Sequence, residues 1–283
     1  MKALTDSSVG TIALGDLEVR RLGYGAMRIT GKGVWGQPPD PDVARELLRR
    51  LPGLGVDLID TADSYGPEVS EELIAEALHP YDGITIATKG GLERTGPGKW
   101  PRNGRPEHLK RACEGSLRRL RVERIDLYQL HAPDPEVPYE ESVGALRELQ
   151  DEGKIRHVGV SNVDLDQLER ARGIVEVVSV QNRFNLADRS AEPVLERCEE
   201  LGIGFIPWFP LAAGELAEPG GTAAEIAAAH DAGPGQIALA WLLRRSPVMV
   251  PIPGTSSIEH LQENLAAAEI ELTDDEVERL NAG

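Results

Sequence analysis

The feature that most limits how this sequence can fold is a repeated alternation of short apolar runs with amphipathic stretches of helical period. Each run ends in a polar residue or a glycine, and a loop then leads into the next helical stretch. The runs predict strands at residues 22–26, 56–60, 84–89, 125–131, 155–161, 177–181, 204–208 and 248–252. The stretches that follow them predict helices at residues 41–51, 70–78, 106–120, 139–151, 164–172, 191–201, 234–245 and 258–267. Because crossovers of this length favour parallel pairing, we predict an α/β fold whose strands close into a (β/α)8 TIM barrel.

Three segments fall outside this repeat. Residues 10–23 predict a β-hairpin that turns at Gly15 and Asp16 and would close the bottom of the barrel. Residues 222–233 predict an extra helix, and residues 273–283 predict a C-terminal helix with Thr273 as its N-cap. No linker or low-complexity segment interrupts the chain, so we predict that residues 1–283 form a single domain.

Charge, cysteine positions and hydropathy argue against nucleic-acid or membrane partners and against a disulfide-linked fold. The formal net charge of −17 argues against nucleic acid or an anionic membrane as a partner. Cys113 and Cys198 lie on apolar helical stripes and are predicted to be buried free thiols. No secretory leader pattern or apolar stretch of membrane length is evident, so we expect a soluble cytoplasmic protein.

Polar and aromatic side chains stand where the predicted strands end, which is the face of such barrels that carries chemistry. Lysine is scarce, with six residues against 24 arginines, so a lysine at a strand end is notable. Taken singly, each of these residues has an ordinary structural explanation, but together they converge on one mouth. In chain order the residues are Asp60, Tyr65, Lys89, His131, Ser161, Asn162, Gln181 and Trp208.

These residue types suit proton transfer to a carbonyl oxygen. An ammonium beside a phenol favours the phenolate, so we expect Lys89 to lower the pKa of Tyr65 from about 10, while Asp60 holds Lys89 charged. Tyr65 is then a candidate general acid or base, and a hydride donor must be bound beside it. No histidine pair is spaced for zinc, and no serine–histidine–aspartate set is evident.

Motifs along nearly the whole chain resemble those of the aldo-keto reductases. They are GYGAM (23–27), DTADSYG (60–66), SEEL (70–73), TKGG (88–91), DLYQLHAPD (126–134), GVSN (159–162), VQNRFNL (180–186), PWFPLAAGEL (207–216) and PIPGTSSIEHLQEN (251–264). The resemblance implies a catalytic tetrad at Asp60, Tyr65, Lys89 and His131. It also implies contacts to a nicotinamide carboxamide from Ser161, Asn162 and Gln181, with Trp208 stacking on the ring where tyrosine is commoner.

The same resemblance implies a nicotinamide cofactor bound without a Rossmann fold. Its pyrophosphate would lie along a loop that contains Leu211, Gly214 and Leu216. Its adenosine end would lie against Gly254, Thr255, Ser256, Ser257, His260, Glu263 and Asn264. Gly254 stands where many NADPH-preferring members have a lysine, and His260 where they have an arginine. The absence of these two positive charges weakens the expected preference for NADPH over NADH. We predict NADPH as the cofactor, with NADH as the alternative.

A finer resemblance concerns the substrate. The segments RLGYGAM, GKGVWGQPPD, SYGPEV and WFPLAAG are similar to a bacterial subgroup that includes pyridoxal reductases. Trp35 and Trp100 would either wall a pocket for an aromatic aldehyde or merely pack their loops. We therefore predict an oxidoreductase for a small carbonyl substrate, pyridoxal being one candidate, that acts as a monomer or weak homo-oligomer.

Two alternatives of other classes stay open at this point. One is a cofactor-binding regulatory subunit with little turnover. The other is a Schiff-base lyase that uses Lys89 as its nucleophile. The complete tetrad opposes the first, and the pairing of Lys89 with Asp60 opposes the second, because a nucleophilic lysine has to lose its proton.

Overall fold

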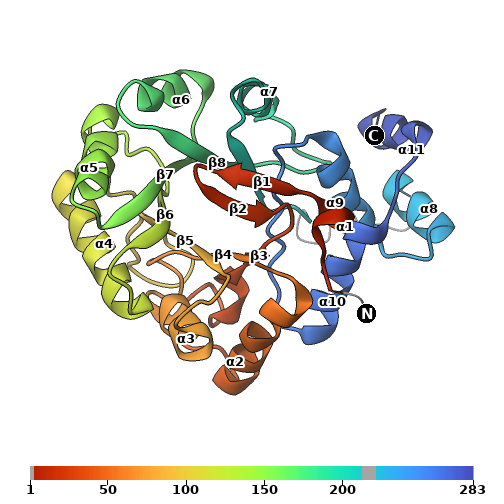
Figure 1. Cartoon of the computed structure of the whole chain (residues 1–283), viewed down its shortest axis with the longest axis horizontal. Helices are drawn as coiled ribbons and strands as arrows, with labels where there is room; N and C mark the ends of the chain where they lie inside the picture. The colour runs from red at the N-terminus through yellow and green to blue at the C-terminus, as the bar shows by residue number, and fades with distance from the viewer. Residues whose placement is uncertain (1–2, 212–220, 283) are drawn as a thin grey trace.

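A parallel sheet curls around the centre of the protein, with helices on its outer face (Figure 1). The computed structural model describes residues 3–211 and 221–282. Seven strands pair in parallel in chain order: β3 (Tyr24–Gly25), β4 (Leu58–Asp60), β5 (Thr85–Gly90), β6 (Ile125–Leu130), β7 (Ile155–Ser161), β8 (Val177–Arg183) and β9 (Gly204–Trp208). This arrangement confirms the predicted α/β barrel class and brings the C-terminal ends of the strands to one face.

The helices predicted between the strands begin and end within one residue of their predicted bounds, whereas the extra helix predicted at residues 222–233 ends at Ala229. The helices are α1 (Asp6–Val9), α2 (Pro41–Arg50), α3 (Val69–Leu78), α4 (Pro106–Leu120), α5 (Tyr139–Asp151), α6 (Leu165–Arg172), α7 (Glu192–Leu201), α8 (Thr222–Ala229), α9 (Pro234–Arg245), α10 (Ile258–Ala266) and α11 (Asp274–Ala282). Thr273 caps α11 as expected, because its hydroxyl accepts from the amide of Glu276 at 3.3 Å. The short helix α1, which Thr5 caps, was not predicted.

The predicted eighth strand, at residues 248–252, does not form a regular strand, which corrects the sequence prediction. It still spans the gap between the last and first strands. The amide of Phe205 donates to the carbonyl of Val248, and the amide of Val250 donates to the carbonyl of Phe205, both at 2.8 Å. On the other side, the amide of Gly23 donates to the carbonyl of Pro251 at 2.9 Å. Prolines at 251 and 253 have no N–H to donate, so a continuous ladder cannot form there.

The predicted hairpin lies across the bottom of the barrel (Figure 1). Strands β1 (Thr11–Leu14) and β2 (Leu17–Arg20) pair antiparallel around Gly15, whose φ of +67° suits a tight turn. Leu14 approaches so closely that a Cβ on Gly204 would come within 2.3 Å of its Cδ2. The hairpin therefore closes this end of the barrel.

Two layers of side chains fill the barrel above the hairpin. The lower layer packs hairpin residues against apolar residues of the strands; the cluster is Leu14, Leu17, Val19, Leu58, Ala87, Leu127, Val178, Ile206, Val250 and Ile252. Two residues further along β4, β5 and β6, on the same inward face, come Asp60, Lys89 and Gln129. The change from apolar to polar marks the level at which the core ends and the site begins.

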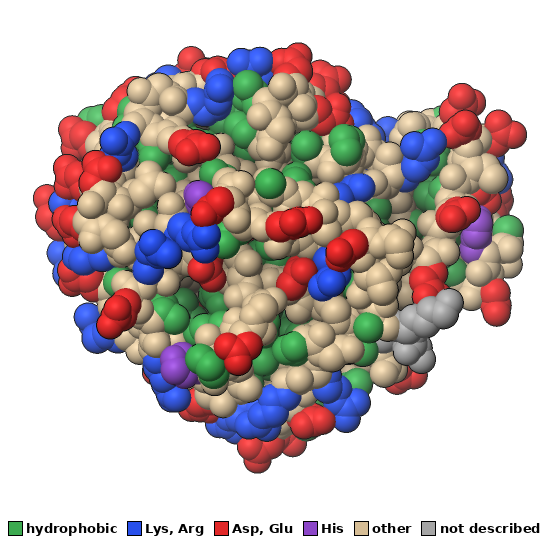
Figure 2. Space-filling view, viewed as in Figure 1, with side chains coloured by type: hydrophobic (Ala, Val, Ile, Leu, Met, Phe, Trp, Pro, Cys, Tyr) green, Lys and Arg blue, Asp and Glu red, His purple; other side chains and the backbone are tan. Residues whose placement is uncertain are grey.

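The surface carries both signs of charge over the face drawn in Figure 2, despite the net charge of −17. Cys113 and Cys198 are buried free thiols, as predicted. Among the described residues, no helix combines the length and the apolar character needed to cross a bilayer.

Candidate active site

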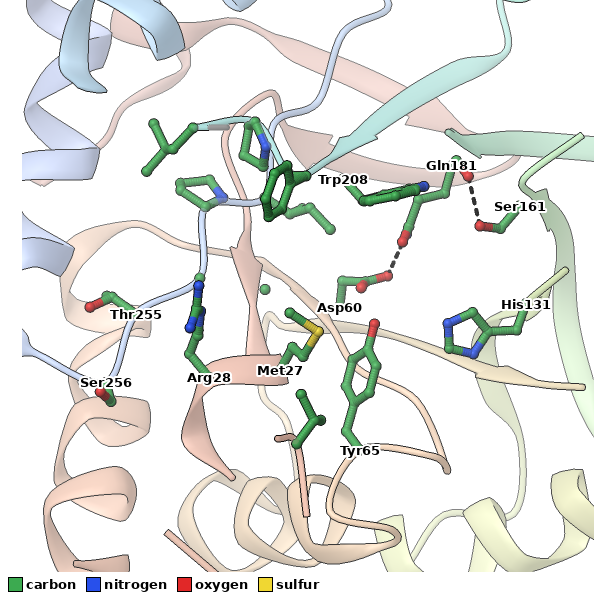
Figure 3. A pocket seen from close by; sticks show the side chains of 18 of the residues that line it. Met27, Arg28, Asp60, Tyr65, His131, Ser161, Gln181, Trp208, Thr255 and Ser256 are labelled. Carbon is green, nitrogen blue, oxygen red and sulfur yellow. Dashed lines mark hydrogen bonds between the residues drawn. The ribbon is translucent and has the colours of Figure 1, made fainter. Parts of the chain in front are cut away.

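A cavity of about 980 Å³ opens at the C-terminal ends of the strands (Figure 3). Many of the predicted residues line it: Asp60, Tyr65, Trp100, His131, Ser161, Asn162, Gln181, Trp208, Leu211, Gly254, Thr255, Ser256 and His260. They come from segments spread over the whole chain, which the barrel brings to one mouth. The size and largely apolar lining are typical of a small-molecule site.

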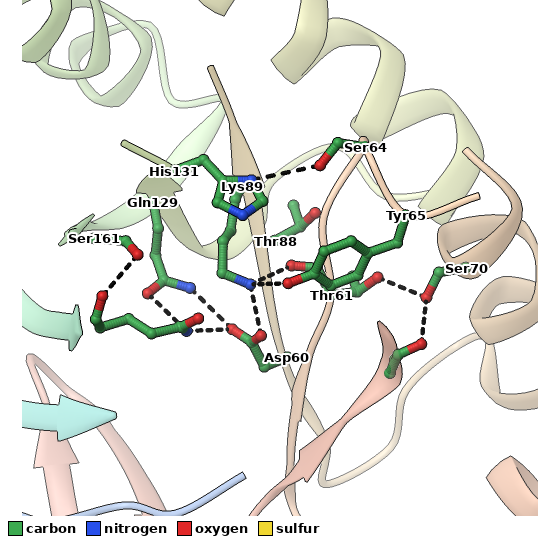
Figure 4. A network of polar contacts seen from close by, with 12 residues as sticks. Asp60, Thr61, Ser64, Tyr65, Ser70, Thr88, Lys89, Gln129, His131 and Ser161 are labelled. Atoms are coloured by element: carbon green, nitrogen blue, oxygen red, sulfur yellow. Dashed lines mark hydrogen bonds and ion pairs between the residues drawn. The ribbon is translucent and has the colours of Figure 1, made fainter. Parts of the chain in front are cut away.

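Lys89 is the centre of a buried polar network beneath this cavity (Figure 4). Its ammonium donates to Asp60 Oδ1 at 2.5 Å, to the carbonyl of Thr61 at 2.8 Å and to the Tyr65 hydroxyl at 3.4 Å. The side chains of Lys89 and Asp60 are 0% and 2% exposed. Three acceptors match the three donors of the ammonium, so its position is fully determined.

Two amides support Asp60 from the opposite side. Gln129 Nε2 donates to Asp60 Oδ2 at 3.1 Å, and Gln181 Nε2 donates to the same oxygen at 2.8 Å. These bonds stabilise the carboxylate in a buried position where an unpaired charge would be costly. Sequence reasoning missed Gln129, although a polar residue on the inward face of an apolar strand was the available signal.

The pKa values of the network corrected one expectation. Burial raises the pKa of Tyr65 above its ordinary value of 10.0, and this outweighs the opposing effect of Lys89, so the expected lowering does not occur. Burial disfavours the charged form of Lys89, but Asp60 and then Tyr65 outweigh it, and its pKa is raised. Tyr65 is therefore a protonated phenol, and Lys89 is a charged ammonium unsuited to Schiff-base attack.

His131 faces Tyr65 across the mouth. The two rings meet edge to face with centroids 5.9 Å apart, and His131 Nδ1 lies 3.5 Å from the hydroxyl of Ser64. Burial, and then the charge of Lys89, lower the pKa of His131 well below 6.5. The imidazole is therefore neutral near neutral pH and has one N–H to donate and one nitrogen to accept.

The three residues predicted to hold a carboxamide form one connected group with Trp208. The Ser161 hydroxyl donates to the carbonyl of Gln181 at 2.7 Å. Asn162 Nδ2 donates to the carbonyl of His131 at 2.9 Å and to Ser161 Oγ at 3.0 Å. Trp208 Nε1 donates to Asn162 Oδ1 at 3.0 Å. The donors of these residues thus have protein partners in this structure.

The segment predicted to hold the adenosine end divides into two groups. Gly254, Thr255, Ser256 and His260 line the cavity, whereas Ser257, Glu263 and Asn264 do not. Ser257 is instead the N-cap of α10, and Asn264 is buried within that helix. Leu211 lines the cavity, while Gly214 and Leu216 lie outside the described residues.

Arg28 is a cation of the cavity wall that sequence reasoning did not select. It follows β3 and lies beside the segment of Thr255 and Ser256 (Figure 3), where a Cβ on Gly254 would be 3.5 Å from its Cγ. Among the described residues it has no ion pair with a carboxylate. Met27 and Phe209 also line the cavity without having been predicted. A basic residue just after the first strand was the available signal for Arg28.

The two tryptophans proposed for a substrate wall have different positions. Trp100 lines the cavity, and its ring meets that of Tyr65 edge to face with centroids 6.3 Å apart. Trp35 is 37% exposed and is not part of the cavity wall, although its neighbour Val34 is. The structure thus places Trp100 in the cavity wall and Trp35 outside it.

Comparison with known proteins agrees with the geometry. Residues 21–282 match the Aldo/keto reductase family. An uncharacterized oxidoreductase of Schizosaccharomyces pombe is 51% identical, covering 99% of this chain and 91% of its own. The pyridoxine 4-dehydrogenase of Escherichia coli is 42% identical, and the match covers 97% of this chain and 98% of the relative. A Klebsiella pneumoniae aldo-keto reductase whose crystal structure is in complex with NADPH is 28% identical in sequence. Its structure matches with a TM-score of 0.82 over 96% of this chain and 94% of its own. The chain belongs to the aldo/keto reductase family of oxidoreductases.

Proposed function

We propose that this protein reduces an aldehyde or ketone to an alcohol, with Tyr65 as the general acid and NADPH as the cofactor. The observation that carries the proposal is the position of the Tyr65 hydroxyl, which lies 3.4 Å from the buried Lys89 ammonium on the wall of the cavity. A protonated phenol next to a fixed positive charge can release its proton to a carbonyl oxygen.

The residues in the cavity fit a nicotinamide cofactor. Hydroxyl and amide oxygens have two lone pairs each, and the hydrogen bonds above use at most one on Ser161 Oγ, Asn162 Oδ1 and Gln181 Oε1. The remaining acceptors suit the amino group of a carboxamide. Trp208 offers a flat face for the ring, and Arg28 a charge for a phosphate. The chemistry that a bound reduced nicotinamide supplies is hydride transfer to the carbonyl carbon.

The protein's own groups then divide the remaining work. Tyr65 donates its phenolic proton to the carbonyl oxygen. Lys89 stabilises the phenolate left behind, and Asp60 keeps Lys89 protonated. The neutral His131 donates a hydrogen bond that orients the same oxygen. The apolar wall around them limits water and strengthens each of these electrostatic interactions.

For the substrate we propose an aromatic aldehyde such as pyridoxal. The proposal is supported by the 42% identity to a relative named pyridoxine 4-dehydrogenase and by Trp100 in the cavity wall. The test is the loss of absorbance of NADPH, and of NADH in parallel, with pyridoxal against a panel of aldehydes and ketones. Turnover of pyridoxal well above the panel supports the assignment. Turnover of other carbonyls alone removes pyridoxal, and no turnover with any carbonyl removes the proposed reductase function.

Replacement of Arg28 by glutamine should weaken NADPH binding about tenfold, the effect of losing one hydrogen bond to a charged group. Fluorescence titration measures the Kd of NADPH and NADH for each variant. Equal weakening assigns Arg28 to the pyrophosphate common to both cofactors, and selective weakening of NADPH assigns it to the 2′-phosphate. Arg49→Gln, an equal charge change at an exposed residue of α2, is the control. A change of less than about twofold for both cofactors would show that Arg28 holds no phosphate.

The pKa directions predict how the reduction depends on pH. Because the pKa of Tyr65 is raised above 10.0, its acid form persists as pH rises, and because that of His131 is well below 6.5, its neutral form persists as pH falls. We expect kcat/KM for the carbonyl to stay level from about pH 6 to about pH 9 and to fall only at higher pH. A steady-state pH profile tests this, and a transition with its midpoint between about 6 and 8 would contradict it.

We further propose that residues 1–283 act as one domain in the cytoplasm, as a monomer or weak homo-oligomer. The continuous alternation of strands and helices supports the first point, and the net charge of −17 is consistent with a small-molecule partner rather than a polyanion. Light scattering of the purified chain would measure the oligomeric state.

A further inference from the structure

Arg94 connects three loops at the mouth of the barrel. Its guanidinium donates to four backbone carbonyls: Nη2 to Gly33 at 2.9 Å and to Gly96 at 3.5 Å, Nη1 to Ser64 at 2.9 Å, and Nε to Lys99 at 3.0 Å. Gly33 belongs to the loop after β3, Ser64 to the loop after β4, and the other two to the loop after β5. One side chain therefore fixes the relative positions of the loops around the end of the cavity that Tyr65 and Trp100 line.

The same guanidinium lies against aromatic rings. Its central carbon is 3.6 Å from the ring centroid of Trp100 and 5.7 Å from that of Trp35. Trp100 in turn contacts the ring of Tyr65 edge to face. Contacts between a cation and an aromatic face at these distances are attractive, and the planar guanidinium stacks on indole better than an ammonium does. Arg94 thus supports the outer face of the cavity wall from behind.

Arg94 itself is not part of the cavity lining. We propose that it is a positioning residue that fixes Trp100 as a flat wall beside Tyr65 and thereby gives the enzyme its preference for aromatic over small aliphatic aldehydes. The inference rests on the proposed function as a carbonyl reductase. Trp100 forms the wall that selects the substrate, and Arg94, which lies outside the cavity lining, holds that wall in place.

The geometry separates this role from that of the general acid. Tyr65 is held by backbone hydrogen bonds of its own loop, from its amide to the carbonyl of Ala62 and from the amide of Ser70 to its carbonyl, both 3.1 Å. Arg94 also bonds the carbonyl of Ser64, next to Tyr65, but these two backbone bonds and the contact of the Tyr65 hydroxyl with Lys89 remain when Arg94 is replaced. Loss of Arg94 should therefore release Trp100 while Tyr65 stays in place. The kcat/KM for an aldehyde too small to reach Trp100 should change little.

The test compares Arg94→Gln, Arg94→Lys, Trp100→Ala and the double variant Arg94→Gln/Trp100→Ala. Arg102→Gln is the matched control, because Arg102 lies in the same loop and donates to the carbonyl of Pro133 at 3.1 Å. We would measure kcat and KM for 4-nitrobenzaldehyde and for propanal, the Kd of NADPH by fluorescence, and the Tm. The last two readouts report folding and cofactor binding independently of turnover.

We expect Arg94→Gln to lower kcat/KM for 4-nitrobenzaldehyde by about 10- to 100-fold, mainly through KM, since small displacements of positioning groups have effects of this size. The value for propanal should change by less than about threefold, and the Kd of NADPH by less than about twofold. Arg94→Lys should not restore the aromatic preference. The double variant should be no worse than Trp100→Ala, because both changes remove the same wall.

Three results would overturn the inference: equal losses for both aldehydes, additive losses in the double variant, or an Arg94→Gln variant equal to the wild type. If Arg94→Gln fails to fold, Arg94→Lys carries the same comparison, because it keeps the aliphatic stem and the charge. Absence of carbonyl turnover in the wild type would instead overturn the proposed function, so the two failures are distinguishable.

Discussion

Tyr65→Phe should lower kcat for carbonyl reduction by about 10²- to 10⁴-fold, the usual contribution of a positioned general acid. The substitution removes one oxygen and leaves the ring that packs against Trp100 and His131. The Kd of NADPH should therefore stay within about twofold of the wild type, and the effect should reside in the chemical step. Single-turnover oxidation of bound NADPH measures that step directly.

The chain offers a matched control for this experiment. Tyr81 is as buried as Tyr65, each being 8% exposed, and its hydroxyl donates to the carbonyl of Leu120 at 2.8 Å, away from the cavity. Tyr81→Phe removes the same atom from a buried tyrosine and should leave kcat unchanged. A Tyr65→Phe variant that kept more than about a tenth of the wild-type kcat would refute the assignment of Tyr65 as the acid.

Lys89→Met should both inactivate and destabilise the enzyme. It removes the ammonium beside Tyr65, which should lower kcat by about 10²- to 10³-fold, as loss of one preorganised electrostatic group does. It also leaves Asp60 as an unpaired buried carboxylate, and breaking a buried pair from one side costs about 3–5 kcal/mol of the free energy of unfolding. Urea denaturation and single-turnover kinetics measure the two effects.

A second substitution separates the two roles of Lys89. In Lys89→Met/Asp60→Asn the buried charge is gone, so much of the lost stability should return while activity does not. Lys110→Met breaks the surface pair with Glu148 and should leave both quantities essentially unchanged. If the double variant were less stable than Lys89→Met, the charge of Asp60 would not be the source of the destabilisation.

Sequence patterns were enough to predict the residues at the strand ends. Alternation along each strand determines which side chains face inward, and the barrel topology collects the ends of all strands at one face. For this reason the sequence alone predicts that Asp60, Lys89 and His131 lie together. The prediction of a strand at residues 248–252 is wrong, because the apolar pattern does not account for the prolines at 251 and 253, which prevent a regular ladder.

Other features of the site depend on contacts that no local pattern encodes. Arg94 reaches the carbonyl of Gly33 across 61 positions of sequence, and neither residue follows a strand or helix period. The pKa of Tyr65 depends on two opposing effects, burial and the nearby ammonium, and the sequence gives no measure of the first. The residue types thus predict that Asp60, Lys89 and Tyr65 are neighbours. They do not predict that burial outweighs Lys89 in setting the pKa of Tyr65.

The hairpin across the bottom of the barrel has a consequence for how the enzyme exchanges protons with bulk water. The layer between the hairpin and the Asp60–Lys89 pair is packed from apolar side chains, which offer water no hydrogen-bond partners. If Tyr65 is the general acid, as proposed, the proton that it releases is replaced from the open mouth of the cavity and not from below. The same apolar layer has a low dielectric constant and keeps solvent away from the Asp60–Lys89 pair. It therefore strengthens the electrostatic effect of Lys89 on the proposed acid Tyr65.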